Sequence, residues 1–305
     1  MKKRKAKYKY QAFGLNIQSV FEIPEFLPAE FETPDVEIYF EKVPSDLDEI
    51  EKKGLRYRLN QRELLLNLDH VADYYVKEGK QILIQKKEES TLQEVRLFLV
   101  GIVFSALLHQ RGTFALHASA LKKDDDCFLV AGNSGAGKST LTREFLNDGY
   151  QVLSDDIGVL EKTNDVIQVK PAFPFIKLWK DSMEHLELDE MEGKKLRDQM
   201  DKYGFGLDPG KEFYTEELPV KKIFILTAHN QAEYKSEKLK GIDKFNALKN
   251  HTYRFQFIAN RVRPSHFELI NHIANRIPVY RVTRPQAPIN PKGLKDFIEK
   301  ILNED

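Results

Sequence analysis

Residues Gly132 to Thr140 read GNSGAGKST and fit the pattern G-x-x-x-x-G-K-[ST]. Glycines allow such a loop to curl until several backbone N–H groups point at one anion. Lys138 adds a mobile positive charge that can reach the β- and γ-phosphates of a nucleotide, and the Ser139 hydroxyl is the expected magnesium ligand. We therefore expect ATP and Mg2+ to bind here. The expected phosphate-binding residues are Gly132, Asn133, Ser134, Gly135, Ala136, Gly137, Lys138, Ser139 and Thr140.

Two adjacent acids, Asp155 and Asp156, follow the stretch Tyr150–Ser154, and Asp155 comes 17 positions after Lys138. One short helix and one short strand fill that gap, so we expect the acids beside the loop. Phosphoryl transfer needs a carboxylate to hold magnesium, and often another to orient or deprotonate the nucleophile. The closeness of two buried acids raises the pKa of one relative to the other. The residues alone do not divide these roles between them, and a solvated acidic turn is the alternative.

A histidine precedes the loop by one expected strand. Phe114–Leu121 is strand-like, 122–126 is a charged hairpin turn, and Cys127–Ala131 is an apolar strand that leads into the loop. A hairpin here brings His117 towards the phosphate end of the sheet, although the register stays open. A purely structural histidine is the alternative reading.

The segments around the loop favour a strand, a glycine loop and a helix, which aims a helix N-terminus at phosphate. After the loop, apolar residues recur at helical spacing over 141–146, and Asp148-Gly149 resembles a helix C-terminal cap. Cys127 is the only cysteine, so an intramolecular disulfide is excluded, and we expect a small buried hydrophobic side chain.

Composition limits the class of protein. The 305 residues carry 47 basic and 47 acidic side chains, and this balance argues against a general nucleic-acid binder. Hydrophobic residues make up 41%, enough for a sizeable core. We find no uncharged run long enough to span a membrane, and the basic start Met1–Lys5 lacks the apolar stretch of a signal peptide. We expect a cytoplasmic protein without nucleic-acid or membrane partners, and leave a homo-oligomer open.

The first 88 residues form an expected N-terminal β-rich domain, read as a small antiparallel unit. We expect a surface or turn role for His70. The expected strands are Tyr8–Leu15, Val36–Phe40, Leu55–Leu59, Glu63–Leu68, Ala72–Val76 and Gln81–Gln85.

The second domain is expected over 89–305. It begins with a helix over 89–110 that is apolar nearly all round, capped by Ser90 with Gln93 at capping-box spacing. We expect this helix to pack as a bridge between the two domains.

The C-terminal half gives weaker signals. Residues 171–179 read either as an extended segment lining the site or as a packed β-corner, and 180–204 as a charged helical insertion. An arginine commonly stabilises charge on a transferring phosphoryl group, but the sequence singles out none of the late ones. These are Arg254, Arg261, Arg263, Arg281 and Arg284. Further expected elements are strands at 220–226 and 279–282 and helices near 242–250, 263–276 and 292–303.

Three segments together, Leu116–Leu121, the GNSGAGKST loop and Leu153–Asp156, resemble the catalytic domain of the HPr serine kinase/phosphorylase family. Within that group the chain is most similar to the stand-alone kinases of lasso-peptide gene clusters, including its Tyr8–Leu15 opening and its Pro174–Trp179 segment. The resemblance implies an α/β fold, a P-loop nucleotide-binding domain of the HPr kinase type with a small N-terminal β-rich domain.

The resemblance also implies roles. Lys138 and the loop amides bind the ATP phosphates, and Ser139 holds magnesium with an aspartate, Asp155 or Asp156. Asp155 activates a serine hydroxyl, and His117 lies near the transferred phosphate. The implied activity is an ATP-dependent serine kinase, and the implied acceptor is the C-terminal serine of a ribosomally made lasso-peptide precursor.

Two other functions stay open. The first is a kinase of HPr or of a small-molecule hydroxyl. However, a second glycine-rich signature is missing downstream of the acids, which argues against the reverse phosphorylase activity, and the different N-terminal domain makes HPr a less expected substrate. The second is a P-loop nucleotide switch or transport ATPase, which calls for a later apolar strand ending in Asp-Glu or a Leu-Ser-Gly-Gly signature. We find neither.

Overall fold

A computed structural model describes residues 7–186, 188–189, 193–197, 200–260, 263–287 and 290–304. The fold is mixed α/β and divides into two compact units. Unit 1 comprises Met1–Ala115 and Arg254–Glu268, and unit 2 comprises Leu116–Tyr253 and Leu269–Asp305. The basic start Met1–Lys5 and the candidate Arg261 lie outside the described residues.

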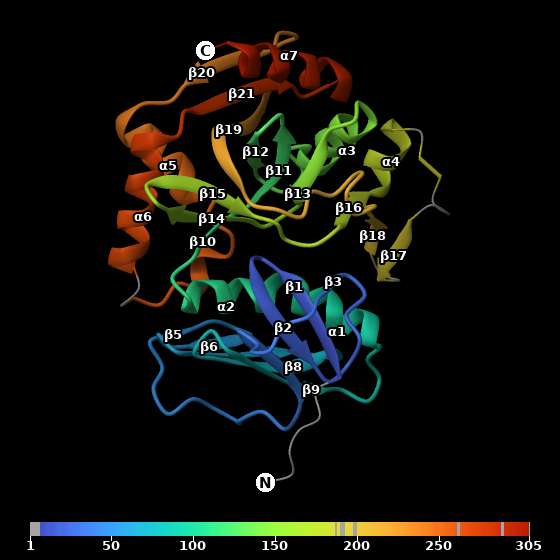
Figure 1. The fold of residues 1–305 in the computed structure, drawn as a ribbon, viewed down its shortest axis with the longest axis vertical. Coiled ribbons are helices and arrows are strands. Elements are labelled where there is room, and N and C mark those ends of the chain that lie inside the picture. The colour runs from blue at the N-terminus through green and yellow to red at the C-terminus, as the bar shows by residue number, and fades with distance from the viewer. Residues whose placement is uncertain are drawn as a thin grey trace. The chain divides into compact units, whose positions relative to one another are not determined.

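Unit 1 is built on one sheet with the strand order β3-β1-β2-β4-β9-β8-β7-β6-β5 (Figure 1). Its strands are β1 (Tyr8–Ala12), β2 (Leu15–Ser19), β3 (Leu27–Pro28), β4 (Val36–Phe40), β5 (Lys52–Lys53), β6 (Tyr57–Leu59), β7 (Glu63–Leu68), β8 (Ala72–Lys77) and β9 (Gln81–Lys86). His70 lies exposed in the turn before β8 with a left-handed φ of 62°, so the turn role expected for it is confirmed.

The expectation of a purely antiparallel N-terminal unit is wrong at its centre. Strand β4 pairs in parallel with both β2 and β9. The reason is the long connection from β2 to β4, because only tight hairpins force neighbouring strands to run antiparallel. Tyr8–Leu15 is also not one strand, since Phe13 and Gly14 both adopt positive φ and turn the chain between β1 and β2.

The expected apolar helix is present, with a different cap and an interruption. It runs as α1 (Leu92–Phe98), a π-helical turn η1 (Leu99–Val103) and α2 (Phe104–Gln110). Thr91 and Glu94 form the capping box, one position after the expected Ser90 and Gln93. The Thr91 hydroxyl accepts from the Glu94 amide at 3.2 Å, and the Glu94 carboxylate accepts from the Thr91 amide at 3.1 Å.

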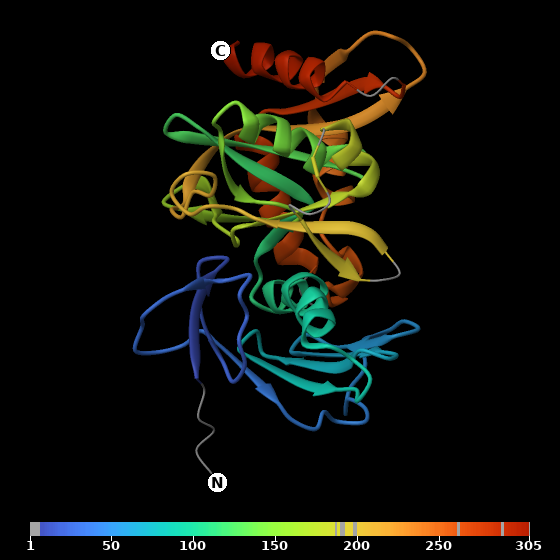
Figure 2. The same cartoon turned by 90° about the vertical axis from the view of Figure 1, so that its right-hand side faces the viewer.

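The α1–α2 helix lies against the strands of unit 1 (Figure 2). The Tyr74 hydroxyl donates to the Val95 carbonyl at 2.9 Å, and the rings of Phe13 and Phe104 stack with centroids 5.5 Å apart. This helix, over 92–110, is long and apolar enough to cross a membrane, but 61% of its most apolar stretch is buried inside the protein. The compact units divide after Ala115, so this helix belongs to unit 1 rather than to a domain beginning at 89.

Unit 2 contains a second sheet, with the order β10-β14-β15-β19-β12-β11-β13 and with β21 beside β19. Its strands are β10 (Phe114–Leu116), β11 (Ala118–Lys123), β12 (Asp126–Gly132), β13 (Gln151–Ser154), β14 (Gly158–Thr163), β15 (Val166–Lys170), β19 (Leu218–His229), β20 (Lys235–Lys238) and β21 (Val279–Pro285). Cys127 is buried and free in β12, as expected.

The pairing directions bring several strand ends to one edge of this sheet. Strands β12, β19 and β21 are parallel, while β11 runs antiparallel to both β12 and β13. Strand β13 therefore runs in the same direction as β12. The carboxyl ends of β12, β13 and β21 consequently meet the amino end of β11 at the same edge, and that edge carries the candidate site.

The helices of unit 2 are α3 (Lys138–Asn147), α4 (Lys180–His185), α5 (Gly241–Asn250), α6 (Arg263–Arg276) and α7 (Pro291–Asn303), and α6 begins in the segment assigned to unit 1. Helices α3 and α7 pack together (Figure 1). Helix α3 ends at Asn147 with Asp148 as its C-cap, and Gly149 follows with a φ of +84°, as the cap pattern predicted. The expected helices near 242–250, 263–276 and 292–303 and the strands at 220–226 and 279–282 are confirmed.

The expected charged helix over 180–204 is wrong beyond α4. The chain instead forms β17 (Lys194–Arg197) and β18 (Met200–Gly206), which join β16 (Phe175–Trp179) in a small sheet of order β16-β18-β17. Tyr203, Gly204 and Phe205 are buried in succession, and in the sequence of this strand aromatic residues alternate with glycines. Gly204 admits the Phe175 ring, because a Cβ there would lie 2.0 Å from the ring carbon Cζ.

Candidate active site

The glycine loop leads from β12 directly into α3, as the sequence predicts. Gly135 and Gly137 adopt φ values of 81° and 99°, which side-chain-bearing residues rarely reach. Gly132 is required for close packing rather than for its φ angle, since a Cβ there would lie 3.1 Å from the Leu226 carbonyl oxygen on β19. Around these glycines Asn133 and Ser134 are exposed, and the buried Thr140 donates to the Ser182 hydroxyl at 2.8 Å.

Lys138 is the buried cation of the loop, with 6% of its surface exposed. Its Nζ donates to the carbonyl oxygens of Gly132 at 2.9 Å and Asn133 at 3.3 Å. Burial lowers the pKa of Lys138, and the nearby aspartates oppose that effect. The ammonium group is thus held over the loop by neutral carbonyls, which an anion with more charge can replace.

His117 interrupts the strand expected over Phe114–Leu121, because β10 ends at Leu116 and β11 begins at Ala118. Its Nε2 lies 3.1 Å from Lys138 Nζ, and its Nδ1 lies 3.0 Å from the carbonyl oxygen of Asp156. An ammonium can only donate, so Nε2 accepts and the proton is assigned to Nδ1. Burial, reinforced by the charge of Lys138, lowers the pKa of His117 and favours the neutral ring.

Asp155 lies at the end of β13 with only 5% of its surface exposed. Its Oδ1 accepts from the Ser119 hydroxyl at 2.7 Å and from the Ser139 hydroxyl at 3.3 Å, and its Oδ2 accepts from the backbone N–H of Lys177 at 3.2 Å. Burial raises the pKa of Asp155, and the charge of Asp156 adds to that shift. This carboxylate is therefore a better proton acceptor than an ordinary aspartate.

The pKa of Asp156, the next residue, shifts in the opposite direction to that of Asp155. Its φ of 74° turns the chain so that its carboxylate faces Lys177, with Oδ2 3.6 Å from Nζ, and His117, with Oδ1 3.7 Å from Nδ1. Burial alone would raise the pKa of Asp156, but the charges of Lys177 and Lys202 outweigh it and hold this pKa well below its usual range. The two acids thus differ in their readiness to take a proton.

Three residues at the site were not chosen from the sequence. Lys177 pairs with Asp156, and Ser119 is hydrogen-bonded to Asp155. Arg284 Nε donates to the carbonyl oxygen of Ala136 at 3.1 Å. This arginine, one of the late group, therefore stabilises the loop. The parallel pairing of β21 with β19 places it there, and no local pattern around Arg284 announces that pairing.

Among the other late arginines that the structure describes, Arg281 pairs with Glu237 at 2.7 Å and Arg263 is exposed. Within the segment over 171–179, Phe175–Trp179 forms strand β16, and the Lys177 amide donates to Asp155, so this part is extended beside the acid.

Oxygen donors suitable for magnesium are close together at this edge. Ser139 Oγ lies 3.3 Å and 3.4 Å from the two carboxylate oxygens of Asp155, and Asp156 follows. The described part of the chain holds no cluster of three or more His, Cys, Asp or Glu residues able to bind a metal alone. Magnesium commonly uses one or two carboxylates with substrate phosphates and water, so Ser139, Asp155 and Asp156 fit it.

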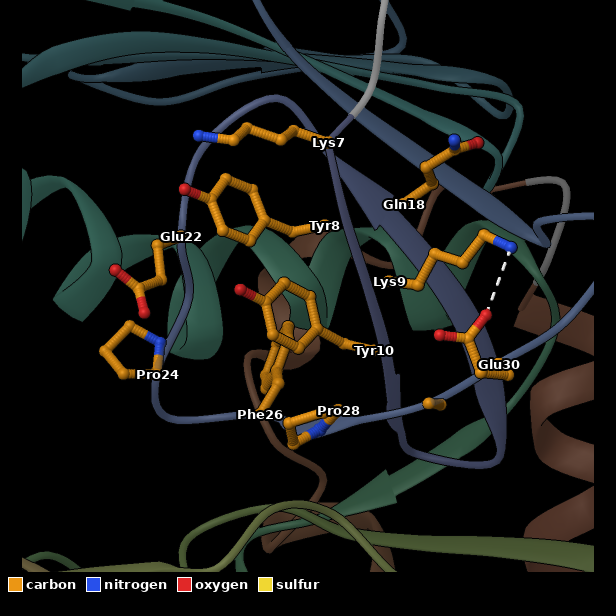
Figure 3. A pocket seen from close by; sticks show the side chains of 11 residues that line it. Lys7, Tyr8, Lys9, Tyr10, Gln18, Glu22, Pro24, Phe26, Pro28 and Glu30 are labelled. Atoms are coloured by element: carbon orange, nitrogen blue, oxygen red, sulfur yellow. Dashed lines mark ion pairs between the residues drawn. The ribbon is translucent and has the colours of Figure 1, made fainter.

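A separate hollow of about 850 Å3 lies on unit 1 (Figure 3). Tyr8, Tyr10 and Phe26 line it, and Lys9 pairs with Glu30 at 3.5 Å across its rim. Its lining includes none of the candidate site residues. We place the chemistry at the sheet edge of unit 2, because buried charges with opposed pKa shifts converge there.

Comparison with known proteins gives little further guidance. No family model and no curated protein matches the chain. Among solved structures, 63 chains match, and one is the HPr(Ser) kinase/phosphatase from Coxiella burnetii, at 14% sequence identity and a TM-score of 0.30. That match covers 62% of this chain and 93% of the other. A likeness this low carries no functional argument.

Proposed function

We propose that this protein is an ATP-dependent kinase that transfers the γ-phosphate to a serine hydroxyl, with Mg2+ as its cofactor. One observation carries the proposal: a glycine loop with a buried lysine, a neutral histidine and two acids of opposed pKa shift meet at one sheet edge. A glycine turn that only connects a strand to a helix requires neither the buried cation nor the acids.

The loop and Lys138 are assigned to nucleotide binding. The backbone N–H groups at the start of α3 face the phosphates, and Lys138 exchanges its contacts with the Gly132 and Asn133 carbonyls for phosphate oxygens. Neutral His117 accepts from Lys138 and so orients the ammonium without adding repulsion.

Asp155 is assigned as the base. Its raised pKa suits a group that takes the proton of the serine hydroxyl while the serine oxygen bonds to the γ-phosphorus. The bond from that phosphorus to the β,γ-bridging oxygen breaks, and ADP leaves with the electron pair. Asp156 remains ionised beside Lys177. Ser139 and Asp156 would hold Mg2+, which when bound neutralises charge on the phosphate oxygens.

The acceptor is proposed from the sequence resemblance to lasso-peptide kinases. We assign it as a serine-containing precursor peptide, phosphorylated at its C-terminal serine, in the cytoplasm where ATP and Mg2+ are plentiful.

Mass spectrometry tests this function directly. The full chain is incubated with Mg-ATP and a synthetic peptide ending in serine, and separately with the same peptide ending in alanine. We expect a gain of about 80 Da, one phosphate, on the serine peptide alone. Phosphate on HPr or a small molecule but not on the peptide would favour the other kinase hypothesis. ATP hydrolysis without any transfer would favour a nucleotide switch.

A further inference from the structure

In the part of the chain that the structure describes, three cations of the candidate site contact polar partners. Lys138 donates to loop carbonyls, Lys177 pairs with Asp156, and Arg284 donates to the Ala136 carbonyl. A further cation is Lys202, whose Nζ lies 5.3 Å from the centroid of the Trp179 ring.

Lys202 and Trp179 lie on the face of the small sheet that also carries Lys177. Trp179 is directly opposite Lys202 in the pairing of β16 with β18, and Lys177 is two residues before Trp179. Side chains two apart on a strand point to the same face, so Lys177, Trp179 and Lys202 share one surface. Because Lys177 reaches Asp156 at 3.6 Å, this surface continues directly from the two acids.

Trp179 is unusually open for its size, with 42% of its surface exposed, while its strand neighbour Leu178 is fully buried. Lys202 shares this surface with Lys177, whose Nζ lies 3.6 Å from Asp156 Oδ2, so its positive charge is placed on the same face as a residue in contact with the acids. An open aromatic ring and a half-buried lysine beside a transfer site suit a ligand with an apolar part and a negative group.

We infer that Lys202 and Trp179 form an acceptor subsite that binds the C-terminal carboxylate of a peptide whose last residue is the phosphorylated serine. This inference rests on the proposed function. In a C-terminal serine the hydroxyl and the carboxylate are borne on neighbouring carbons, so a cation beside the base can bind one while Asp155 meets the other. The Trp179 ring contacts the preceding peptide segment.

Trp179 is the only tryptophan in the chain, so its fluorescence reports on this subsite without requiring catalysis. The full chain is titrated with an N-acetylated synthetic peptide ending in serine, once as the free acid and once as the C-terminal amide. We expect a saturable change in fluorescence and about 10-fold to 100-fold tighter binding of the acid, the range for a hydrogen bond to a charged group.

The matched variants are Lys202→Met and Lys194→Met, which each remove one lysine from the same small sheet. Lys202→Met should remove the preference for the acid, Lys202→Arg should keep most of it, and Lys194→Met should leave it unchanged. Equal binding of acid and amide to the native chain would overturn the subsite, as would a preference that survives Lys202→Met.

Binding and transfer separate the two proposals. Acid-selective binding without a mass gain on the peptide refutes the kinase function and leaves the subsite standing. A mass gain of equal rate on acid and amide supports the kinase and refutes the subsite. If Lys202→Met raises the KM for ATP while the acid preference persists, Lys202 serves the nucleotide and the inference is wrong.

Discussion

The two units differ in how their buried polar groups are compensated by partners. In unit 1 they are neutral or paired: the Tyr74 hydroxyl donates to a helix carbonyl, and Arg96 pairs with Glu25 at 3.0 Å. In unit 2, Asp155 lies at the edge of the sheet, where burial and the charge of its neighbour Asp156 both raise its pKa. The polar groups of unit 1 therefore stabilise its fold, while unit 2 retains an unfavourable charge where chemistry is expected.

The largest effect is expected from Lys138→Ala. The substitution removes the buried cation that faces the phosphates, so phosphate transfer should fall by at least about 100-fold and ATP binding should weaken. Kinetics of phosphate transfer and calorimetric titration with Mg-ATP measure the two effects. The control Lys221→Ala, at an exposed lysine of β19, should retain both properties. Equal behaviour of the two variants would refute the role assigned to Lys138 in binding the phosphates.

Asp155→Asn should separate activity from stability. Loss of the base should reduce turnover by about 10²-fold to 10⁴-fold while Mg-ATP still binds. The amide can still hydrogen-bond to Ser119 and Lys177, so the thermal midpoint at pH 7 should hold or rise. Unchanged turnover in this variant would refute the assigned base.

The pH dependence of that stability difference has a defined sign. The folded pKa of Asp155 lies above its ordinary value of 3.8, so the stability it contributes is present below 3.8 and is lost as pH rises through the raised pKa. Any gain in thermal stability from Asp155→Asn should therefore be largest near neutral pH and should shrink towards pH 4. Thermal unfolding of both proteins across that range tests this, and a gain that grows on acidification would contradict it.

Asp156→Asn should give a smaller loss of turnover and, unlike Asp155→Asn, a loss of stability. Its lowered pKa means that ionisation is favoured in the fold, and its contribution is present above 3.8 and lost as pH falls through the lowered pKa. At pH 7 the thermal midpoint should fall by about 2–4 °C for each kcal/mol lost. If both asparagine variants shift the midpoint in the same direction, the opposed roles of the two acids are wrong.

The smallest effect on activity is expected from Arg96→Ala in unit 1. It leaves the largely buried Glu25 without its partner and should lower the free energy of unfolding by about 1–3 kcal/mol. The KM for ATP should not change. The control Arg62→Ala breaks an exposed ion pair with Glu78 and should change stability by less than about 1 kcal/mol. A large loss of turnover in Arg96→Ala would show that unit 1 contributes to the chemistry.

Much of the site's placement could be predicted from local sequence. The GNSGAGKST pattern predicted the strand, loop and helix, because its glycines are needed locally, either for a positive φ or for close packing of the backbone. The spacing from Lys138 to Asp155 predicted acids near the loop, since only one helix and one strand fit between them. The hairpin turn near 124 also predicted His117 at this edge, because the turn makes β11 run antiparallel to the strand that leads into the loop.

The features that were missed depend on contacts between distant segments. Arg284 reaches the loop through the parallel pairing of β21 with β19, and nothing around Arg284 distinguishes it from Arg281. The region over 180–204 was interpreted as a helix because its many charges masked the alternation of aromatic residues with glycine over 203–206. Long connections decided the parallel pairing of β4, and local periodicity carries no information about strand direction.

The central claim is that the loop, Lys138 and the two acids converge on one triphosphate. A crystal structure of the full chain with Mg2+ and a non-hydrolysable ATP analogue measures this directly. The account predicts phosphates along the N–H groups at the start of α3, Lys138 in contact with them, and both carboxylates facing the terminal phosphate. A nucleotide bound elsewhere, or carboxylates turned away from its phosphates, would contradict the account.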